Sequence, residues 1–566
     1  MNSSPEKKAA WNVRLLHTLW ELDFLPEEPT EVKGVSAAAK SNLFFALSGM
    51  CYFFLYVRWG VDSALIWDAM VVALFFLSCL VPAIHRGIRL PRLGKAMALL
   101  NAIGAMGAGV RVAMDFFAEA YGTMQIAEML GLSSKLVAVG ISGVFGLCGF
   151  WFLYVFIARV YTAMSPVFSR LFSGTGRKER LALGALALAL AVFAALAFSR
   201  SEAFYGTEHH YDVIYTADSP YLVMGNTWLN LTYMENDLRQ PLFAVFALPF
   251  VGWAYVLAQL VPSGHWLAPW LMNLPQLGLL VLGFYMLASL LSEKAAGRLA
   301  VTVSMCALYP SLLFSLMMEQ YILAVFWLLL FVYMAVEKLP GRGMALVAAS
   351  GSLLTSAAML PMLWRKHAPR PVKRALGQSL VAAGIGAFLI LAFLRLDVLL
   401  NLTKTAEQLS SFVGESVPLI GRLQQYVHFV ASCFEPPLAG ETTVSGHLSW
   451  QLLPVSGFRL DGLAVLCLCA LGAFWGRRER LVQISAWWCL FSVLLLVGLG
   501  WGTAENGLIL YGLYFSWAFY VLFRRAVVWP GRWQTAADWL LALFLLVLNV
   551  LGMVELLNFA VNAYPV

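Results

Sequence analysis

Charged residues are scarce in this chain. They make up 12% of its 566 residues, whereas hydrophobic residues make up 61%, and the mean hydropathy is +0.76. Soluble globular domains carry about 25% charged residues, so a soluble fold is excluded. Apolar runs of about 20 residues recur along the chain, which is the length a helix needs to cross a bilayer. Because these runs are continuous rather than alternating, they favour an all-α polytopic membrane protein over a β-barrel.

The chain also lacks the cysteine patterns of zinc sites and disulfide frameworks. Its eight cysteines form no CxxC pair and no His/Cys ligand spacing, so we expect neither zinc nor disulfides. The net charge of +7 is spread over short clusters, as membrane topology requires, which argues against nucleic-acid binding. The N-terminal stretch lacks a hydrophobic core followed by a cleavage site, so it is not a signal peptide.

Apolar segments divide the chain into a tail and two groups of predicted spans. Residues 1–41 form a cytoplasmic or interfacial tail. Residues 42–165 form a four-span module that is a candidate for binding a protein partner, and 176–566 form the core. The predicted spans are 42–58, 64–84, 96–117, 136–162, 180–198, 271–292, 298–317, 320–336, 376–396, 461–475, 482–500, 507–523 and 537–555.

Short basic clusters orient these spans, because Lys and Arg gather in cytoplasmic loops. The clusters lie at 85–95, 169–180, 292–298, 337–342, 365–374, 476–480 and 524–533. They share one side only if neither 241–261 nor 343–364 makes a net crossing. We therefore expect 241–261 to lie at the outer interface or to re-enter, and 343–364 to form a broken helical hairpin. In the plasma membrane, the loops 199–260 and 397–460 would then be extracytoplasmic.

The first of these outer loops holds an acidic stretch that ends in "RQPLFAVFALPF". Asp218 lies soon after the predicted span 180–198, and Arg239 begins the closing element. This order resembles the first outer loop of the GT-C glycosyltransferases, in particular their aminoarabinose- and mannosyl-transferring branch. Ser219 stands where that family has a second acidic residue.

Two further stretches keep the order of that family. "ALYPSLLFSLMMEQYILAVFWLLLFVY" resembles a pair of spans with an outer acidic residue at the start of the second, which is Glu319 here. "GSLLTSAAMLPML" resembles the family's G-x-x-x-L-T-K…LP element, with Ser356 in place of the lysine. The resemblance covers about 180–365, and more loosely 376–555. It implies a GT-C-like transmembrane helical core with extracytoplasmic loops.

The resemblance also implies a reaction, in which a sugar moves from a polyprenyl-phosphate donor to a glycan, lipid or protein acceptor of the cell envelope. Asp218 would be the catalytic base. The acidic residues on the acceptor side, which could alternatively hold a divalent cation, are Glu319, Glu235 and Asp237. The guanidinium groups that could clamp the donor phosphate belong to Arg239, Arg422 and Arg459. Ion pairing with Arg239 is the structural alternative for Glu235 and Asp237.

Two later stretches could border the same site. In the second outer loop, Leu419, Leu423, Tyr426 and Val427 recur at helical spacing and predict an amphipathic helix that caps the cavity. Tyr511 and Tyr514 could contact substrate at the outer end of a late span, although aromatic anchoring at the membrane interface is the commoner role.

Two other functions fit the same sequence. A polysaccharide polymerase or ligase would also be multispan with a large outer loop, but it would need several outer arginines. A lipid-linked-sugar transporter would need charges or broken helices along a path through the membrane. The concentration of carboxylates in one outer loop favours the transferase.

Overall fold

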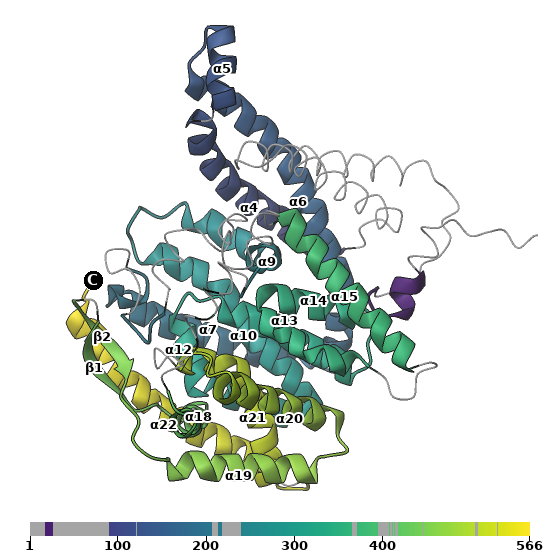
Figure 1. The fold of residues 1–566 in the computed structure, drawn as a ribbon, viewed down its shortest axis with the longest axis vertical. Coiled ribbons are helices and arrows are strands. Elements are labelled where there is room, and N and C mark those ends of the chain that lie inside the picture. Colours follow the sequence, from purple (N-terminus) through teal and green to yellow (C-terminus); the bar gives the residue numbers. More distant parts are fainter. Residues whose placement is uncertain are drawn as a thin grey trace, which may run out of the picture.

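The computed structural model shows an almost entirely helical protein over the residues it describes (Figure 1). These are residues 17–25, 90–119, 121–206, 213–217, 239–364, 371–393, 407, 410, 413, 417–444, 446–503, 508–528 and 530–566. Within them, the only sheet is a two-stranded hairpin. The predicted spans 42–58 and 64–84 lie outside the described residues.

Three helices of the N-terminal module form an arm that projects from the helical bundle (Figure 1). They are α4 (Arg92–Glu119), α5 (Tyr121–Leu130) and α6 (Ser134–Ser173). α4 and α6 cover the predicted spans 96–117 and 136–162. The 40 residues of α6 make it about 60 Å long at 1.5 Å per residue.

The arm packs directly on α9 (Phe243–Ala258) of the core through facing glycines. A Cβ added at Gly252 would lie 2.2 Å from the carbonyl oxygen of Asn101, and one at Gly104 would lie 1.8 Å from the carbonyl oxygen of Gly252. The Asn101 side chain also accepts a hydrogen bond of 3.1 Å from the amide of Trp253. Glycine is therefore required where α4 and α9 cross.

The core begins with four predicted spans, and all four are helical. They correspond to α7 (Arg177–Phe198), α10 (Leu267–Leu291), the pair α11 (Ala295–Cys306) and α12 (Tyr309–Leu316), and α13 (Tyr321–Val336). α11 and α12 are bent by 67° relative to each other. Pro310 lies in the first turn of α12, where its missing N–H is tolerated, so a new helix begins there.

The segment 343–364 forms the broken hairpin that the sequence predicts. α14 (Arg342–Ser352) leads into the bundle, and the 3₁₀-helix η3 (Leu354–Leu363) leads out of it. Leu353, with φ −152° and ψ 110°, is the extended residue at the tip. The two arms are too short to cross a bilayer separately, because a spanning helix needs about 20 residues.

The C-terminal part of the chain completes the bundle around the buried helix α13. Its helices are α15 (Pro371–Phe393), α18 (Leu419–Ser432), α19 (Leu460–Trp475), α20 (Arg480–Ser492), η5 (Leu508–Tyr511), α21 (Gly512–Val527) and α22 (Gln534–Ala563). α20 continues as a π-helix over Val493–Gly498. α18 is the amphipathic helix predicted for the second outer loop, and Tyr426 and Val427 are on its buried side.

One hairpin in this half is not predicted from the sequence. β1 (Ala439–Val444) pairs antiparallel with β2 (His447–Leu452), and its outermost pair is Ala439 with Leu452. Trp450 of β2 also bonds to the first outer loop, because its amide donates to the carbonyl of Val213 over 2.8 Å. The hairpin therefore joins the two loops.

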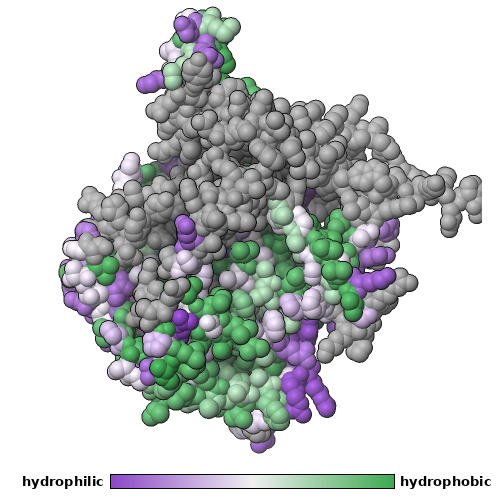
Figure 2. Space-filling model, viewed as in Figure 1, coloured by the Kyte–Doolittle hydropathy of each residue, from purple (hydrophilic) through white to green (hydrophobic). Residues whose placement is uncertain are grey.

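The surface of the bundle is that of a multi-pass membrane protein. Within the described residues, six helices are long and apolar enough to cross a membrane, and the bent α11–α12 pair makes a seventh if it counts as one span. Large apolar side chains point outward, such as Leu188 on α7 and Leu551 on α22, which are 65% and 63% exposed. Figure 2 shows a broad apolar surface whose left-hand and right-hand edges are hydrophilic.

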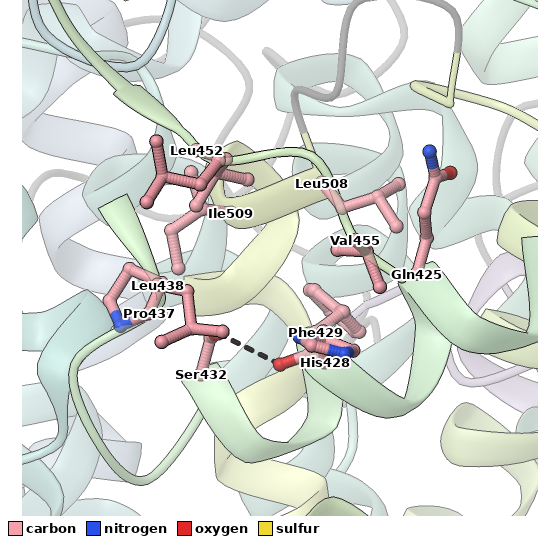
Figure 3. Close-up of a pocket in the computed structure, with 11 residues that line it drawn as sticks. Gln425, His428, Phe429, Ser432, Pro437, Leu438, Leu452, Val455, Leu508 and Ile509 are labelled. Atoms are coloured by element: carbon pink, nitrogen blue, oxygen red, sulfur yellow. Dashed lines mark hydrogen bonds between the residues drawn. The ribbon is translucent and has the colours of Figure 1, made fainter. Parts of the chain in front are cut away.

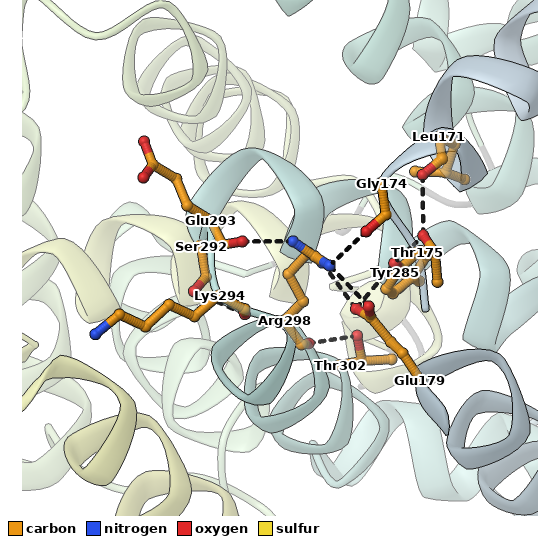
Figure 4. Close-up of polar contacts among 10 residues, drawn as sticks. All are labelled: Leu171, Gly174, Thr175, Glu179, Tyr285, Ser292, Glu293, Lys294, Arg298 and Thr302. Atoms are coloured by element: carbon orange, nitrogen blue, oxygen red, sulfur yellow. Dashed lines mark hydrogen bonds and ion pairs between the residues drawn. The ribbon is translucent and has the colours of Figure 1, made fainter. Parts of the chain in front are cut away.

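Contacts between the basic clusters place them at one end of the bundle, which we call the basic face. Arg298 donates to the carboxylate of Glu179 with a shortest N···O distance of 2.7 Å (Figure 4). Arg170 pairs with Glu337 at 2.5 Å. These bonds join the clusters 169–180, 292–298 and 337–342.

The same face includes the later clusters. Arg480 donates to the carbonyl of Met362 over 2.7 Å, and Arg525 pairs with Glu479 at 2.8 Å. Between the clusters 169–180 and 292–298, α7 and α10 are the described helices long enough to cross a membrane, and α9 is shorter. Asp23 pairs with Arg342 at the start of α14 and with Arg374 beyond η3, so the predicted hairpin returns to the face where it started. These contacts agree with the prediction that 241–261 and 343–364 make no net crossing, which stays a prediction.

Candidate functional site

The predicted site residues divide into those that the structure describes and those that it does not. Asp218, Glu235 and Asp237 lie outside the described residues. The described ones are Arg239, Glu319, Arg422 and Arg459. The residues that lead to Asp218 pack on the β-hairpin and on α12. The Tyr215 hydroxyl lies 2.8 Å from the Tyr309 hydroxyl of α12, and it accepts a hydrogen bond of 3.0 Å from the Trp450 indole of β2.

Arg239 lies against the tip of the hairpin formed by α14 and η3. Its carbonyl accepts a hydrogen bond of 2.7 Å from the amide of Leu354, and the amide of Leu242 donates to the carbonyl of Gly351 over 2.7 Å. A Cβ at Gly351 would lie 2.7 Å from the Phe246 ring and 2.9 Å from Leu242, so the close approach requires glycine. Residues 239–242, at the end of the first outer loop, are thus hydrogen-bonded to the tip of the α14–η3 hairpin.

Glu319 lies in the break between α12 and α13 and is 5% exposed. The break is held by two polar side chains of α10. Asn273 donates to the carbonyl of Ser315 over 2.8 Å, and Gln276 donates to the carbonyl of Met317 over 3.2 Å. Backbone groups freed by a helix break inside a membrane protein need such partners. Glu319 is therefore presented on a segment whose backbone is fixed from α10.

Tyrosine side chains bring Arg239 and Glu319 into one site. Glu319 precedes Tyr321 by two positions, and both charged groups lie within electrostatic range of the hydroxyls of Tyr321 and Tyr514. The rings of these tyrosines pack edge to face with centroids 5.0 Å apart. Gln240, which follows Arg239 in the chain, is 8% exposed. We call this group, together with Tyr511, the polar site.

The polar site lies toward the end of the bundle opposite the basic face. α13 begins at Tyr321, in the site, and ends at Val336 beside Glu337, which pairs with Arg170. Sixteen helical residues rise about 24 Å, which is most of the thickness of a 30 Å hydrocarbon core. The site therefore lies about the length of α13 away from the basic face.

Arg422 and Trp501 border the polar site. The Trp501 indole donates to the hydroxyl of Tyr511 over 2.8 Å. Arg422 on α18 donates from Nε to the carbonyl of Val417 over 3.0 Å. A Cβ at Gly500, whose φ is +73°, would lie 2.6 Å from the Arg422 guanidinium. Arg422 therefore contacts the turn that carries Trp501.

Arg459 belongs to a separate ion-pair network. Its guanidinium pairs with Asp461 at 2.6 Å and also contacts Glu435. Burial, together with the Asp461 carboxyl, raises the pKa of Glu435 to about 7. To bind a donor phosphate, Arg459 would have to leave these carboxylates, so its role as a donor ligand stays a prediction.

A narrow pocket lies between α18, η5 and the chain that flanks the β-hairpin (Figure 3). Gln425, His428 and Ser432 line it from α18, and Leu452 and Leu508 line it from the other side. The cavity volume is about 30 Å³, which is room for one or two water molecules. The pocket is too small for a sugar in this conformation.

The arrangement of the polar site fits a sugar attached to a phosphate. A guanidinium binds phosphate oxygens through paired hydrogen bonds, and a buried carboxylate accepts a proton or hydrogen bond from a hydroxyl. Phenol hydroxyls both donate and accept. Among the described residues, no group of three His, Cys, Asp or Glu side chains could hold a metal ion.

Comparisons with known proteins identify no relative. No family model, no curated protein and no solved structure matches this chain. The resemblance to the GT-C glycosyltransferases thus rests on the quoted motifs alone.

Sequence reasoning underestimated two members of the site. Gln240 is part of the "RQPLF" element but received no role. Tyr514 was expected to act mainly as an interface anchor, yet it is 1% exposed and lies in the protein interior. The signal for Tyr514 was its position at the outer end of a late span. Sequence alone could not show that α21 brings it beside α13.

Proposed function

We propose that this protein is a membrane glycosyltransferase that moves a sugar from a polyprenyl-phosphate donor to an extracytoplasmic acceptor of the cell envelope. One observation carries the proposal. Arg239 and Glu319, which are 80 positions apart, lie within electrostatic range of the same two tyrosines, Tyr321 and Tyr514, whose rings pack with centroids 5.0 Å apart at the end of α13 opposite the basic face. The basic face would be cytoplasmic, so the polar site would open to the outside of the plasma membrane.

The proposed chemistry needs a cation for the leaving group and a base for the acceptor. Arg239 would hold the phosphate, which leaves with the electron pair of the sugar–oxygen bond. An acceptor hydroxyl would attack the sugar carbon and pass its proton to a carboxylate, for which Asp218 is the first candidate. Glu319 would orient the acceptor, and the tyrosine rings would pack on the sugar.

Transfer of a labelled sugar in reconstituted vesicles tests this proposal. The wild type should move label from a polyprenyl-phosphate sugar to an envelope extract, and Glu319→Gln, which removes the carboxylate that orients the acceptor, should lower that rate. Glu441→Gln, at an exposed position of β1, is the matched control and should behave as wild type. Absence of transfer by the wild type with every lipid-phosphate sugar offered would reject the proposal.

A lipid-linked-sugar transporter is the second candidate, and the α14–η3 hairpin favours it. Binding sites of transporters form where discontinuous helices meet inside the membrane, and residues 239–242 meet the hairpin tip end to end. A transporter would move an intact lipid-linked sugar between leaflets without breaking its phosphate bond. Scrambling of a labelled lipid donor, measured without acceptor, separates the two functions.

A further inference from the structure

The N-terminal tail contacts the basic face through one acidic turn, Leu22-Asp23-Phe24. The carboxylate of Asp23 pairs with Arg342 at 2.6 Å and with Arg374 at 3.0 Å. The side-chain amide of Gln378 donates to the carbonyl of Leu22 over 3.2 Å. Two guanidinium groups and one amide, from α14 and α15, thus converge on this turn.

The turn also caps α14. The amide of Gly343, in the first turn of that helix, donates to the carbonyl of Asp23 over 3.0 Å. Phe24 is 1% exposed, and a Cβ at Gly343 would lie 2.8 Å from its ring. Glycine therefore makes room for the aromatic side chain at the place where the acid meets the arginines.

These groups have the composition of a phosphate site. A helix N-terminus presents free N–H groups and a partial positive charge to an anion. Arginines add charge-assisted hydrogen bonds that match phosphate oxygens. Arg342 is 2% exposed, so its charge has been removed from water, which is costly unless an anion accompanies it.

The same place borders a surface suited to lipid chains. On α15, Val372, Leu376 and Leu380 recur every four residues and are 79%, 60% and 63% exposed. Arg374 is at the same level of the helix but on its opposite, bundle-facing side, where it pairs with Asp23. A lipid whose chains cover this apolar row would have its headgroup at the level of the Arg374 guanidinium.

We propose that Arg342, Arg374 and Gln378 form a phosphate-binding site for anionic membrane lipids, and that Asp23 occupies it as a built-in competitor. When a lipid phosphate replaces the carboxylate, the Leu22-Asp23-Phe24 turn leaves and α14 loses its cap. α14 leads to the hairpin tip, where the amide of Leu354 in η3 bonds to Arg239. The lipid composition of the basic face therefore acts on the polar site through a single helix.

Native mass spectrometry of the full chain, with lipids titrated in, tests the proposal. We expect Asp23→Ala to bind one phosphatidylglycerol about tenfold more tightly than the wild type, because the competing carboxylate is gone. Phosphatidylcholine should show no such change. Glu21→Ala, which removes an exposed acid two residues away, is the matched control and should bind like wild type. The double variant Asp23→Ala, Arg374→Ala should lose the extra affinity.

Thermal unfolding of the full chain in nanodiscs is a second measurement. It does not require the variants to be stable in detergent. Asp23→Ala should unfold earlier than wild type in neutral lipid and regain its stability when phosphatidylglycerol is added. Asp23→Asn, a smaller perturbation, should show the same pattern. An equal loss in neutral and anionic nanodiscs would show that Asp23 only neutralises buried arginines, and would overturn the site. Recovery with inorganic phosphate in neutral lipid would overturn the assignment to a lipid.

Discussion

The amide of Leu354 donates a hydrogen bond to the carbonyl of Arg239 over 2.7 Å. Arg239, at the end of the first outer loop, is therefore held at the tip of the α14–η3 hairpin, whose two ends lie at the basic face. The bond uses the backbone of both residues. The side chain of Arg239 can therefore be exchanged without removing the contact that positions it, which makes its charge testable.

Arg239→Ala should weaken binding of the polyprenyl-phosphate donor, because the guanidinium supplies charge-assisted hydrogen bonds to phosphate. Losses of such bonds are about 1.5–3 kcal/mol each, so donor affinity should fall by at least about tenfold. Arg239→Lys should recover part of it, since the charge returns without the bidentate geometry. Equilibrium binding of a fluorescent donor in nanodiscs measures both. Unchanged affinity in the alanine variant would return Arg239 to a structural ion pair.

Asp218→Asn should lower turnover by about 10²–10⁴-fold, as expected when a general base is lost. The asparagine keeps the size and most hydrogen bonding, so donor binding should persist. Glu235→Gln and Asp212→Asn are matched controls and should be milder. If Asp218→Asn kept near-normal turnover while Glu235→Gln or Glu319→Gln abolished it, the base would lie at one of those residues.

Single cysteines should reveal the orientation of the basic face. In a chain whose eight cysteines are replaced, Ala295→Cys and Ala368→Cys should resist an impermeant maleimide applied to intact cells and react after permeabilisation. Thr442→Cys, on an exposed part of β1, should react from outside. Labelling of both 295 and 368 in intact cells would reverse the orientation.

Glu435 should make stability depend on pH. Because burial raises its pKa in the folded protein to about 7, above its ordinary value of 4.5, the folded state binds the proton more tightly than the unfolded state. This contribution is complete below about pH 4.5 and is lost as the pH rises through about 7. Thermal unfolding at pH 5 and pH 8 should therefore differ less in Glu435→Gln than in wild type or in Glu441→Gln. An unaltered difference would contradict the burial.

The crossing of α4 and α9 should tolerate no methyl group. Gly252→Ala places a Cβ 2.2 Å from a backbone oxygen, so the helices must separate, at a cost of about 1–3 kcal/mol or more. Gly140→Ala meets nothing within 4 Å and should be neutral or stabilise by up to about 1 kcal/mol. Thermal unfolding of both variants measures the contrast. Equal effects would mean that the arm does not pack on the core as described.

The elements that could be predicted were those with a local signal. Apolar runs located the spans, and basic clusters showed that 343–364 must return, because charge cannot remain on the wrong side at low cost. The β-hairpin had no such signal, since Thr442 and its neighbours are polar and exposed and show no apolar alternation. The polar site was half predictable. Arg239 and Glu319 stood out as charges beside apolar runs, whereas Tyr514 joined them only through packing of distant helices.

The π-helix at the end of α20 has a consequence for motion near the polar site. A π-helix holds one residue more than the α-helix it interrupts, and such segments are often found at functional sites. Its conversion to α-helix would advance the chain beyond Val493–Gly498 by one position, which is about 100° of rotation and 1.5 Å of rise. Trp501 follows directly. A register shift in this one helix would therefore move the Trp501 indole away from the Tyr511 hydroxyl, to which it now donates.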